Sequence, residues 1–413
     1  MKIAIITSGF LPVIDGVTVS SWARLQKLSQ WGHQVLLFCP DYSQLASIYP
    51  NWKDYIGSIL PGVRVINLPS TPFMDLDFER NVAFWAYPQL QKELKQFQPD
   101  IVHVDEPERL FFGFFRIPGI NYSKSAGIPC VSFFRTNFLD YAEDYFPLFP
   151  EAITAIHWIF KHIFIWIYNA YDVTLVSSQV THPKLIEMGI NNTHYANLLG
   201  FDASQFHPNL RQAGFFQQYY QLPEIDQKVK LIFLGRLTPD KGWDFTLKLL
   251  PDLAKVVNLD RVAWIIAGDG PMRDQINQHF QQFTSHIHFL GRVTPENVPA
   301  ILANCDLHIT TSEKETRGLT ILEAFAAGIP VLAPAAGGVM ENIKPGWNGL
   351  LYQPQNTADF IQQLKQLIEN AKLRQKMGKN SRQDIKEFSW DRTVDNLVNL
   401  WETQIRSKQK IKG

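Results

Sequence analysis

Residues 229–269 read VKLIFLGRLTPDKGWDFTLKLLPDLAKVVNLDRVAWIIAGD and indicate the fold of the chain. The segment opens with an apolar run, VKLIFLGR (229–236), continues through a helical pattern, and closes with a second run, AWIIAGD (263–269). Nearly continuous apolar residues without alternation are typical of strands buried on both faces, as in parallel sheets covered by helices. The segment therefore predicts a strand, a helix and a parallel strand.

The same alternation runs through most of the chain. Similar apolar runs occur at residues 2–7, 34–39, 64–68, 100–104, 130–134, 173–178, 286–291, 307–312 and 329–334. We expect an α/β fold of two Rossmann-like, doubly wound domains. Ligands of open α/β sheets bind beyond the carboxyl ends of the strands, so the two domains are expected to face each other across a cleft.

The domain boundary is predicted where the strand pattern is lost. Residues 208–228 lack the pattern and end in a Pro- and Asp-bearing stretch, which indicates a linker. The expected N-terminal domain spans residues 1–207 and the second domain spans residues 229–388. A helix and a basic tail are expected over residues 389–413.

The composition excludes several classes of protein. The 413 residues carry 39 basic and 39 acidic side chains, and 46% of the residues are hydrophobic, so neither nucleic-acid binding nor intrinsic disorder is indicated. The three cysteines, Cys39, Cys130 and Cys305, are far apart and form no CxxC pair, which favours neither a disulfide framework nor a zinc site. We expect a protein of the reducing cytoplasm with no obligate protein partner.

Residues 312–338, SEKETRGLTILEAFAAGIPVLAPAAGG, carry the most informative motif, with Glu315 and Glu323 eight residues apart. Three residues between these glutamates lead into a helix: Gly318, Leu319 and Thr320. Glycine lets the backbone approach a ligand closely, and the free N–H groups at a helix start bind anions. The two carboxylates would then contact different parts of one phosphate-bearing ligand. The alternative is an ordinary capped helix with solvated acids.

Two cations follow the strand of residues 229–236. Arg236 and Lys241 lie in the turn RLTPDKG, where they could neutralise a diphosphate leaving group in place of a metal ion, although ordinary surface charge also explains them. A later stretch, AGDGP (267–271), places Gly268 in a tight strand-to-helix turn. Its two glycines fall short of the three of a dinucleotide fingerprint, which argues weakly against NAD.

Together these motifs resemble the GT4 family, family 4 of the retaining glycosyltransferases, which has the GT-B fold. The resemblance rests on GRLTPDKG, AGDGP, the E-x7-E element ETRGLTILE with the following AFAAGIPV, the opening strand leading to Asp15-Gly16-Val17, and GFDASQFHP at 200–208. It implies a hexosyltransferase that uses a UDP- or GDP-sugar and needs no metal and no cofactor. It also implies that the C-terminal helix crosses back to the first domain.

The resemblance implies roles for the residues on the donor side. Arg236 and Lys241 would bind the diphosphate, and Gly16 would approach it from the N-terminal domain. Glu315 would contact the hexose hydroxyls and Glu323 the ribose. The expected donor-binding residues are Gly16, Arg236, Lys241, Gly268, Gly318, Leu319, Thr320 and Glu323.

The resemblance assigns the acceptor to the N-terminal domain, where the chain departs from the family pattern twice. Many relatives read FHTNF where this chain reads FRTNF (134–138), so Arg135 replaces a histidine with a permanent cation. Relatives often read HxHEP where this chain reads HVDEP (103–107), which places Asp105 at the second histidine. His103 is either catalytic or a satisfied strand-end histidine. The expected acceptor-binding residues are Asp15, Arg135, Thr136 and Asn137, and the expected catalytic residues are Glu315, Arg236, Lys241 and His103.

Two aromatic segments of the N-terminal domain bear on the acceptor. They are RLFFGFFRIPGI (109–120) and EAITAIHWIFKHIFIWIYNAYD (151–172). Lys161 near the middle of the second would cost about 2.5–3.5 kcal/mol at the centre of a bilayer, so no transmembrane helix is expected. The segments are either core helices or a surface that meets lipid.

The favoured acceptor is a membrane lipid of the diacylglycerol or phosphatidylinositol type. The motifs resemble the branch of the family that contains sulfoquinovosyl and mannosyl lipid transferases. A cytoplasmic protein with weak peripheral membrane contact is then expected. A transferase with a soluble or polysaccharide acceptor is one alternative. The other alternative is a protein that binds a sugar nucleotide without catalysing transfer, which the replacement of the usual histidine by Arg135 suggests.

Overall fold

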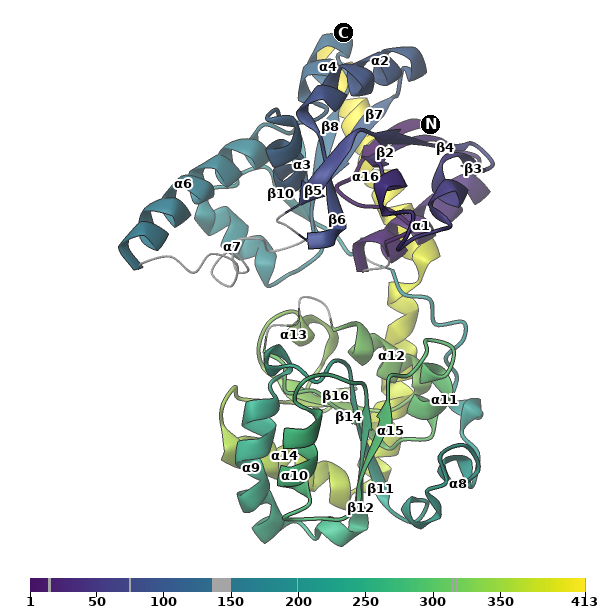
Figure 1. The fold of residues 1–413 in the computed structure, drawn as a ribbon, viewed down its shortest axis with the longest axis vertical. Coiled ribbons are helices and arrows are strands. Elements are labelled where there is room, and N and C mark those ends of the chain that lie inside the picture. Colours follow the sequence, from purple (N-terminus) through teal and green to yellow (C-terminus); the bar gives the residue numbers. More distant parts are fainter. Residues whose placement is uncertain are drawn as a thin grey trace. The chain divides into compact units, whose positions relative to one another are not determined.

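The computed structural model describes residues 1–412 except residues 14–15, 74–75, 136–149, 199, 314 and 316–317. The chain divides into two compact units (Figure 1). Unit 1 comprises Met1–Gly200 with Trp390–Gly413, and unit 2 comprises Phe201–Ser389. Each unit is built on one mainly parallel sheet with helices, which confirms the predicted α/β fold class of two Rossmann-like domains.

Unit 1 contains an eight-stranded sheet of order β10-β9-β8-β7-β1-β2-β4-β3. All neighbouring strands are parallel except β3, which pairs antiparallel with β4. The strands are β1 (Lys2–Ile6), β2 (Gln34–Pro40), β3 (Gly57–Leu60), β4 (Val63–Leu68), β7 (Ile101–Asp105), β8 (Cys130–Phe134), β9 (Val173–Val176) and β10 (Thr193–Tyr195). A separate hairpin pairs β5 (Ser70–Phe73) with β6 (Leu76–Val82).

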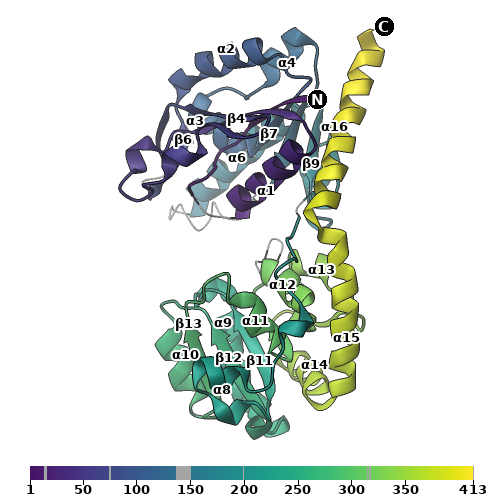
Figure 2. The same cartoon turned by 90° about the vertical axis from the view of Figure 1, so that its right-hand side faces the viewer.

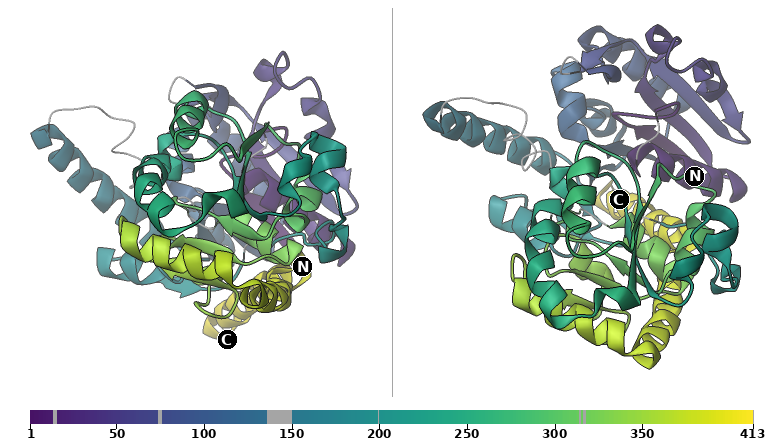
Figure 3. Two further views of the ribbon diagram at one scale, coloured as in Figure 1. Left: turned by 90° about the horizontal axis from the view of Figure 1, so that it is seen from below. Right: turned by 60° about the horizontal axis from the view of Figure 1, so that its bottom comes forward.

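Helices cover both faces of this sheet. One face packs against α1 (Gly16–Gln30) and α16 (Trp390–Lys412), which runs along unit 1 in Figure 2. The opposite face packs against α2 (Tyr87–Phe97), α3 (Pro107–Phe114), α4 (Ile120–Ala126) and the end of α6 (Pro150–Asn169). The other end of α6 extends away from the rest of unit 1 (Figures 1 and 3). A further helix, α7 (Thr181–Met188), precedes β10.

Unit 2 contains a six-stranded, fully parallel sheet of order β13-β12-β11-β14-β15-β16. Its strands are β11 (Val229–Leu234), β12 (Val262–Ala267), β13 (Ile287–Gly291), β14 (Leu307–Ile309), β15 (Val331–Pro334) and β16 (Gly349–Tyr352). Its helices are α8 (Phe215–Tyr220), α9 (Trp243–Val256), α10 (Arg273–Phe280), α11 (Val298–Ala303), α12 (Leu319–Ala327), α13 (Val339–Asn342), α14 (Thr357–Glu369) and α15 (Ala371–Asp384).

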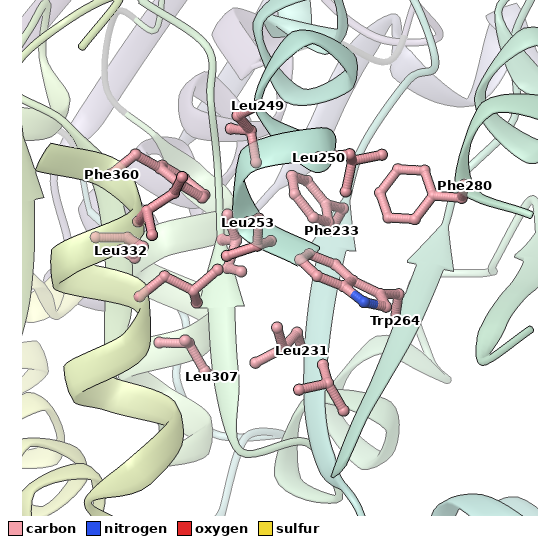
Figure 4. Close-up of a cluster of buried hydrophobic side chains, with 14 of the residues drawn as sticks. Leu231, Phe233, Leu249, Leu250, Leu253, Trp264, Phe280, Leu307, Leu332 and Phe360 are labelled. Atoms are coloured by element: carbon pink, nitrogen blue, oxygen red, sulfur yellow. The ribbon is translucent and has the colours of Figure 1, made fainter. Parts of the chain in front are cut away.

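The core of unit 2 follows from the apolar runs of its strands. Successive residues point to opposite faces, so Leu231 and Phe233 pack under α9, α10 and α14, while Ile232 packs under α11 and α12. Figure 4 shows the first of these clusters, in which the ring of Trp264 in β12 lies next to those of Phe233 and Phe280. Burial on both faces is what the continuous apolar runs predict.

The structure differs from the expected domain limits at two places. The division falls after Gly200, and residues 208–228 belong to unit 2. Phe215, Phe216 and Ile225 are buried in its core, because these apolar side chains cover the sheet face that carries α11 and α12. The chain returns to unit 1 at Trp390, so the C-terminal helix is part of the first unit.

Candidate active site

The ends of β11 and β14 bring together two of the residues expected at the donor site. Lys241 closes the 3-10 turn Pro239–Lys241 that follows β11, and Glu315 lies in the loop after β14. The Nζ of Lys241 is 2.6 Å from Oε1 of Glu315, and both side chains are partly exposed. A phosphate oxygen of a ligand can therefore exchange with the carboxylate for the same ammonium group.

A second carboxylate lies between the two predicted diphosphate-binding cations. Asp240 Oδ2 is 3.3 Å from a guanidinium nitrogen of Arg236 and 3.9 Å from Lys241 Nζ. The Arg236 side chain is 72% exposed, and an exposed pair of this kind contributes at most about 1 kcal/mol. Arg236 can therefore change rotamer at little cost when an anion binds.

Hydrogen bonds join the loops after β11 and β14. The hydroxyl of Thr311 donates to the backbone oxygen of Lys241 over 3.1 Å, and the hydroxyl of Ser312 donates to the backbone oxygen of Asp240 over 3.1 Å. Both Thr311 and Ser312 are buried. These bonds fix the backbone from which Lys241 reaches Glu315.

Helix α12 begins at Leu319, four residues after Glu315. Gly318 has a φ of +68°, and the amides of Ile321 and Leu322 donate to its oxygen. This φ is costly for residues with a Cβ, which explains the glycine. The amides of Leu319 and Thr320 precede these first helical bonds, and N–H groups in that position bind phosphate.

His308 of β14 supports the start of α12. Its Nδ1 lies 3.1 Å from the oxygen of Ile232, and its Nε2 lies 3.2 Å from Oγ1 of Thr320. A carbonyl oxygen only accepts, so Nδ1 carries the proton and Nε2 accepts the threonine hydroxyl. Burial lowers the pKa of His308 to about 4. The neutral ring therefore holds Thr320 in one orientation at pH 7.

Glu323 lies one turn inside α12, and part of its surface reaches solvent. Burial nevertheless raises the pKa of its carboxyl to about 7. About half of the molecules then carry the carboxylate at neutral pH. Ligand hydroxyls that donate to this carboxylate would favour its ionised form.

The remaining expected residues fall at different places. Gly268 follows β12, and a Cβ on it would lie 1.8 Å from the oxygen of Gly235, so only glycine fits in this turn. Gly16 is the first residue of α1 in unit 1. Three of the expected acceptor-side residues lie outside the described residues: Asp15, Thr136 and Asn137.

In unit 1, Arg135 and Asp105 lie together at the carboxyl ends of β8 and β7. A guanidinium nitrogen of Arg135 is 3.7 Å from Oδ2 of Asp105, and Arg135 also donates to the hydroxyls of Ser20 and Ser21 in α1. Arg24, also in α1, forms a close ion pair with Asp105. Burial opposes ionisation of Asp105, but Arg24 and the other neighbouring groups outweigh it and hold the pKa of Asp105 well below its usual range.

His103 lies beside this ion pair with no exposed surface. Its Nε2 is 3.0 Å from Oδ1 of Asp105, and its Nδ1 is 3.2 Å from the indole nitrogen of Trp401 in α16. An indole N–H only donates, so Nδ1 accepts and Nε2 carries the proton. Burial lowers the pKa of His103, which keeps the ring neutral. The structure therefore places this expected catalytic residue in the interior of unit 1, with both ring nitrogens in contact with protein groups.

Comparison with known families identifies the chain. A family model described as Glycosyltransferase Family 4 matches residues 14–196, and one described as Glycosyl transferases group 1 matches residues 218–384. An uncharacterized glycosyltransferase of Methanocaldococcus jannaschii is 30% identical over 422 residues, which cover 97% of this chain and 98% of the relative. The chain belongs to glycosyltransferase family 4.

Other relatives of this glycosyltransferase carry more specific names. The GDP-mannose-dependent alpha-mannosyltransferase of Mycobacterium tuberculosis is 28% identical over 406 residues, covering 97% of this chain and 96% of the relative. The alpha-monoglucosyldiacylglycerol synthase of Streptococcus pneumoniae is 24% identical over 336 residues, covering 81% and 71%. The structure of Anabaena HepE in complex with UDP matches with a TM-score of 0.69 at 18% identity, over 98% of this chain and 100% of that chain. This likeness confirms the GT-B fold.

The glycosyltransferase carries an aromatic surface on unit 1. Its members are the exposed rings of the 3-10 turn η3 (Phe84–Ala86), the end of α3, and α6, namely Phe84, Trp85, Phe115, Trp158 and Trp166. Half-buried rings connect α3 with α6, because the ring of Phe111 lies 5.6 Å from that of Trp166 and the ring of Phe112 lies 5.7 Å from that of Phe160. Of the helices that the structure describes, none has the length and apolar character needed to cross a membrane.

Four residues of these sites were not among the residues expected from the sequence: Asp240, His308, Arg24 and Trp401. Asp240 lies within the quoted turn RLTPDKG, where its charge between two cations is a usable signal. His308 and Trp401 act on partners 12 and 298 positions away, and a single sequence carries no signal for such contacts. In the described part of the chain, no group of three or more His, Cys, Asp or Glu side chains could hold a metal ion.

Proposed function

We propose that this glycosyltransferase moves a hexose from a UDP- or GDP-sugar to a membrane lipid of the diacylglycerol or phosphatidylinositol type, with retention at the anomeric carbon and without a metal ion. The observation that carries the donor site is the 2.6 Å contact between Lys241 and Glu315 in the loops that lead into α9 and α12. A cation, a carboxylate and helix-start amides offer separate partners for a diphosphate and for sugar hydroxyls. HepE with bound UDP and the GDP-mannose-dependent relative support such a donor.

Donor binding on this proposal exchanges partners within the loops. The diphosphate takes the place of the Glu315 carboxylate on Lys241, and Arg236 turns toward it. The released Glu315 then accepts hydrogen bonds from the hexose, and Glu323 accepts from the ribose. The start of α12, held by the His308–Thr320 hydrogen bond, presents its amides to the phosphates.

The chemical step on this proposal takes place on one face of the sugar. The bond from the anomeric carbon to the diphosphate oxygen breaks, and a bond to the acceptor oxygen forms on the same face. The departing phosphate takes the proton of the acceptor hydroxyl, so no protein base is required. The protein stabilises the developing negative charge through Lys241 and Arg236, and loss of one such donor should cost roughly two to three orders of magnitude in kcat.

The acceptor part of the proposal is supported by the aromatic surface. Phe115 is 70% exposed and Trp158 is 63% exposed. Aromatic rings favour the headgroup boundary of a bilayer, where one edge stays wet and the other meets acyl chains. The chain has a formal net charge of zero, so attachment to the cytoplasmic face of a membrane would be weak and mainly hydrophobic. The diacylglycerol named in one relative agrees with a lipid acceptor.

A panel of donors and acceptors tests the proposal. The purified protein is incubated with UDP-glucose, UDP-galactose or GDP-mannose and with vesicles that contain or lack diacylglycerol or phosphatidylinositol, with and without EDTA. We expect a glycolipid by mass spectrometry, an anomeric configuration equal to the donor's by NMR, and an unchanged rate in EDTA. Transfer only to a soluble acceptor, or nucleotide binding without turnover, would contradict the acceptor or the activity. Loss of donor binding in EDTA with rescue by Mg²⁺ would contradict metal independence.

A further inference from the structure

A continuous chain of side-chain contacts runs from the C-terminal helix to Arg135. The Trp401 indole N–H donates to His103 Nδ1 over 3.2 Å, and His103 Nε2–H donates to Asp105 Oδ1 over 3.0 Å. The other oxygen of Asp105 lies 3.7 Å from Arg135. Trp401, His103 and Asp105 have no exposed surface, so each of these interactions acts in a medium where electrostatic effects are strong.

Each member of this series of contacts constrains the orientation of the next, and Arg24 constrains His103 and Asp105 as well. The Trp401 hydrogen bond fixes which His103 nitrogen carries the proton, because Nδ1 must accept. The proton on Nε2 then directs the Asp105 carboxylate, which is also paired with Arg24. With the opposite tautomer, Nε2 could still accept from Arg24, whose Nη1 lies 3.1 Å away, but the Nδ1 proton would face the indole N–H of Trp401, and two donors would meet without an acceptor.

Arg135 is held from two sides by this arrangement. The serines of α1 at positions 20 and 21 accept from its guanidinium, and Asp105 of β7 attracts it. The guanidinium carbon also lies 5.2 Å from the ring centroid of Phe133 in β8. Its side chain keeps only 4% of its surface exposed, and movement of the carboxylate would therefore change where the cation lies.

We propose that Trp401 is a positioning residue for sugar transfer, which acts through His103 and Asp105 to fix the guanidinium of Arg135 against the acceptor. The inference rests on the proposed function and on the acceptor-binding role that the family resemblance implies for Arg135. Helix α16 is then part of the catalytic apparatus as well as part of the core of unit 1. His103 is a positioning residue on the same grounds, because both of its ring nitrogens are engaged inside the protein.

The test is a double-mutant cycle between Trp401→Phe and Arg135→Lys. Phenylalanine keeps an aromatic ring but lacks the indole N–H, and lysine keeps the charge but lacks the planar fork. We expect Trp401→Phe to lower kcat/KM for the acceptor about fivefold, a typical effect of one lost hydrogen bond, and to leave the Kd of the sugar nucleotide unchanged. In the Arg135→Lys background the same change should alter kcat/KM by less than about twofold.

Trp264→Phe is the matched control. Trp264 is also fully buried, and its indole nitrogen has no hydrogen-bond partner among the described residues. This variant loses a similar packing volume without losing a hydrogen bond, so kcat/KM should stay within about twofold at a temperature where every variant is folded. Independent effects of the two changes in the cycle, or a Trp401→Phe variant as active as the control, would overturn the inference.

A spectroscopic readout separates this inference from the proposed function. ¹⁵N NMR of histidine should show His103 with its proton on Nε2 in the wild type and a mixture of tautomers in Trp401→Phe, together with a shifted Arg135 side-chain signal. A wild type that transfers no sugar would contradict the proposed function alone if these signals still respond together. Signals that do not respond to Trp401→Phe would overturn the inference even in an active enzyme.

Discussion

The charged side chains of the loops after β11 and β14 are paired with one another in this structure. Lys241 lies 2.6 Å from Glu315, and Asp240 lies within 4 Å of both Lys241 and Arg236. These groups are partly exposed, so each pair is worth little and can be exchanged for a ligand. The strongly perturbed carboxyl of the helix is instead Glu323, where burial is the cause.

The pairing of Glu315 with Lys241 predicts that Glu315→Gln binds free nucleotide more tightly than the wild type. The carboxylate competes with a diphosphate for Lys241, so its removal should lower the Kd of UDP or GDP about two- to fivefold. Sugar transfer should fall roughly 100-fold, because the hexose hydroxyls lose the charged carboxylate that accepts their hydrogen bonds. Calorimetry with free nucleotide and a transfer assay measure the two effects.

Glu313→Gln is the control for this prediction. It removes one carboxylate charge from the same loop, but from a side chain that accepts a hydrogen bond from Gln355. It should change neither quantity by more than about twofold. A Glu315→Gln variant that binds free UDP or GDP more weakly than the wild type would contradict the competition.

Glu323 predicts a pH dependence near neutrality. Its pKa in the folded protein is about 7, above the ordinary value of 4.5. Folding therefore favours the protonated form, and this contribution to stability is present below pH about 4.5 and lost as the pH rises through 7. Glu323→Gln should melt roughly 7–14 °C above the wild type at pH 8 and together with it at pH 4.5.

The affinity for free nucleotide should change in the opposite direction. If the ionised carboxylate binds the ribose, the affinity of the wild type rises up to about tenfold between pH 6 and pH 8, and Glu323→Gln removes this rise. His308, with a pKa of about 4, does not titrate in this range. Equal pH profiles of wild type and variant in calorimetry would exclude the assigned role.

At the level of elements, helices α3 and α6 together carry most of the aromatic surface on unit 1. Tyr168 at the inner end of α6 donates to the buried carboxyl group of Glu108 in α3, and burial raises the pKa of Glu108 to about 8. The inner part of α6 is thus tied to the core, while Trp158, nearer its outer end, is exposed. Helix α6 is therefore a core helix at its inner end and an exposed aromatic surface nearer its outer end, the two alternatives that its sequence leaves open.

Phe115→Ser/Trp158→Ser should weaken attachment to neutral lipid vesicles severalfold without unfolding unit 1. Both rings are mostly exposed, so their loss removes lipid contact rather than core packing. Co-sedimentation with phosphatidylcholine vesicles measures the effect, which should depend little on salt. Trp31→Ser, an exposed tryptophan next to α1, is the control. A double variant that pellets with vesicles like the wild type would contradict a lipid-binding role of the aromatic surface.

Most strands that are buried on both faces could be predicted from the sequence, although the largely buried β16 was not among the expected strands. The run 130–134 coincides with β8, and the run 2–7 contains β1. Strands with a weaker pattern of apolar residues give no such signal. β3 is half-exposed and β10 has only three residues, so neither produces a continuous apolar run.

The candidate site could be predicted only in part. Lys241 and Glu315 belong to motifs with a fixed local pattern, and the structure brings them together. Their supporting residues have no local pattern. His308 reads as an ordinary strand residue, and Trp401 as an apolar position of a helix, until the fold places them next to Thr320 and His103.

At the level of the whole molecule, the last helix belongs to the first unit. Four side chains of α16 are buried in the core beneath β1 and α1: Val394, Leu397, Val398 and Trp401. Burial of such side chains stabilises by about 1.5–3 kcal/mol each, so together they contribute on the order of 10 kcal/mol. This is comparable with the entire stability of an ordinary domain.

A truncation after Ser389 should therefore unfold unit 1 and leave unit 2 folded. Limited proteolysis with mass spectrometry should give rapid cleavage within residues 1–200 and protection of residues 201–389, and the fragment should still bind nucleotide. A truncation after Lys408 keeps the buried side chains and the contact of Lys408 with Asp172, so it serves as the control. Equal protection of both units after the first truncation would contradict the prediction.

The return of α16 also orders events during synthesis on the ribosome. Unit 2 is one continuous segment and can fold as soon as residues 201–389 have left the exit tunnel. Residues 1–200 emerge earlier and contain every strand of their sheet, yet one face of that sheet lacks its covering helix until residues 390–412 follow. At ordinary translation rates this delay lasts about 10–40 s. For that interval the nascent chain exposes an apolar sheet face, to which a chaperone can bind and through which, without one, neighbouring chains can aggregate.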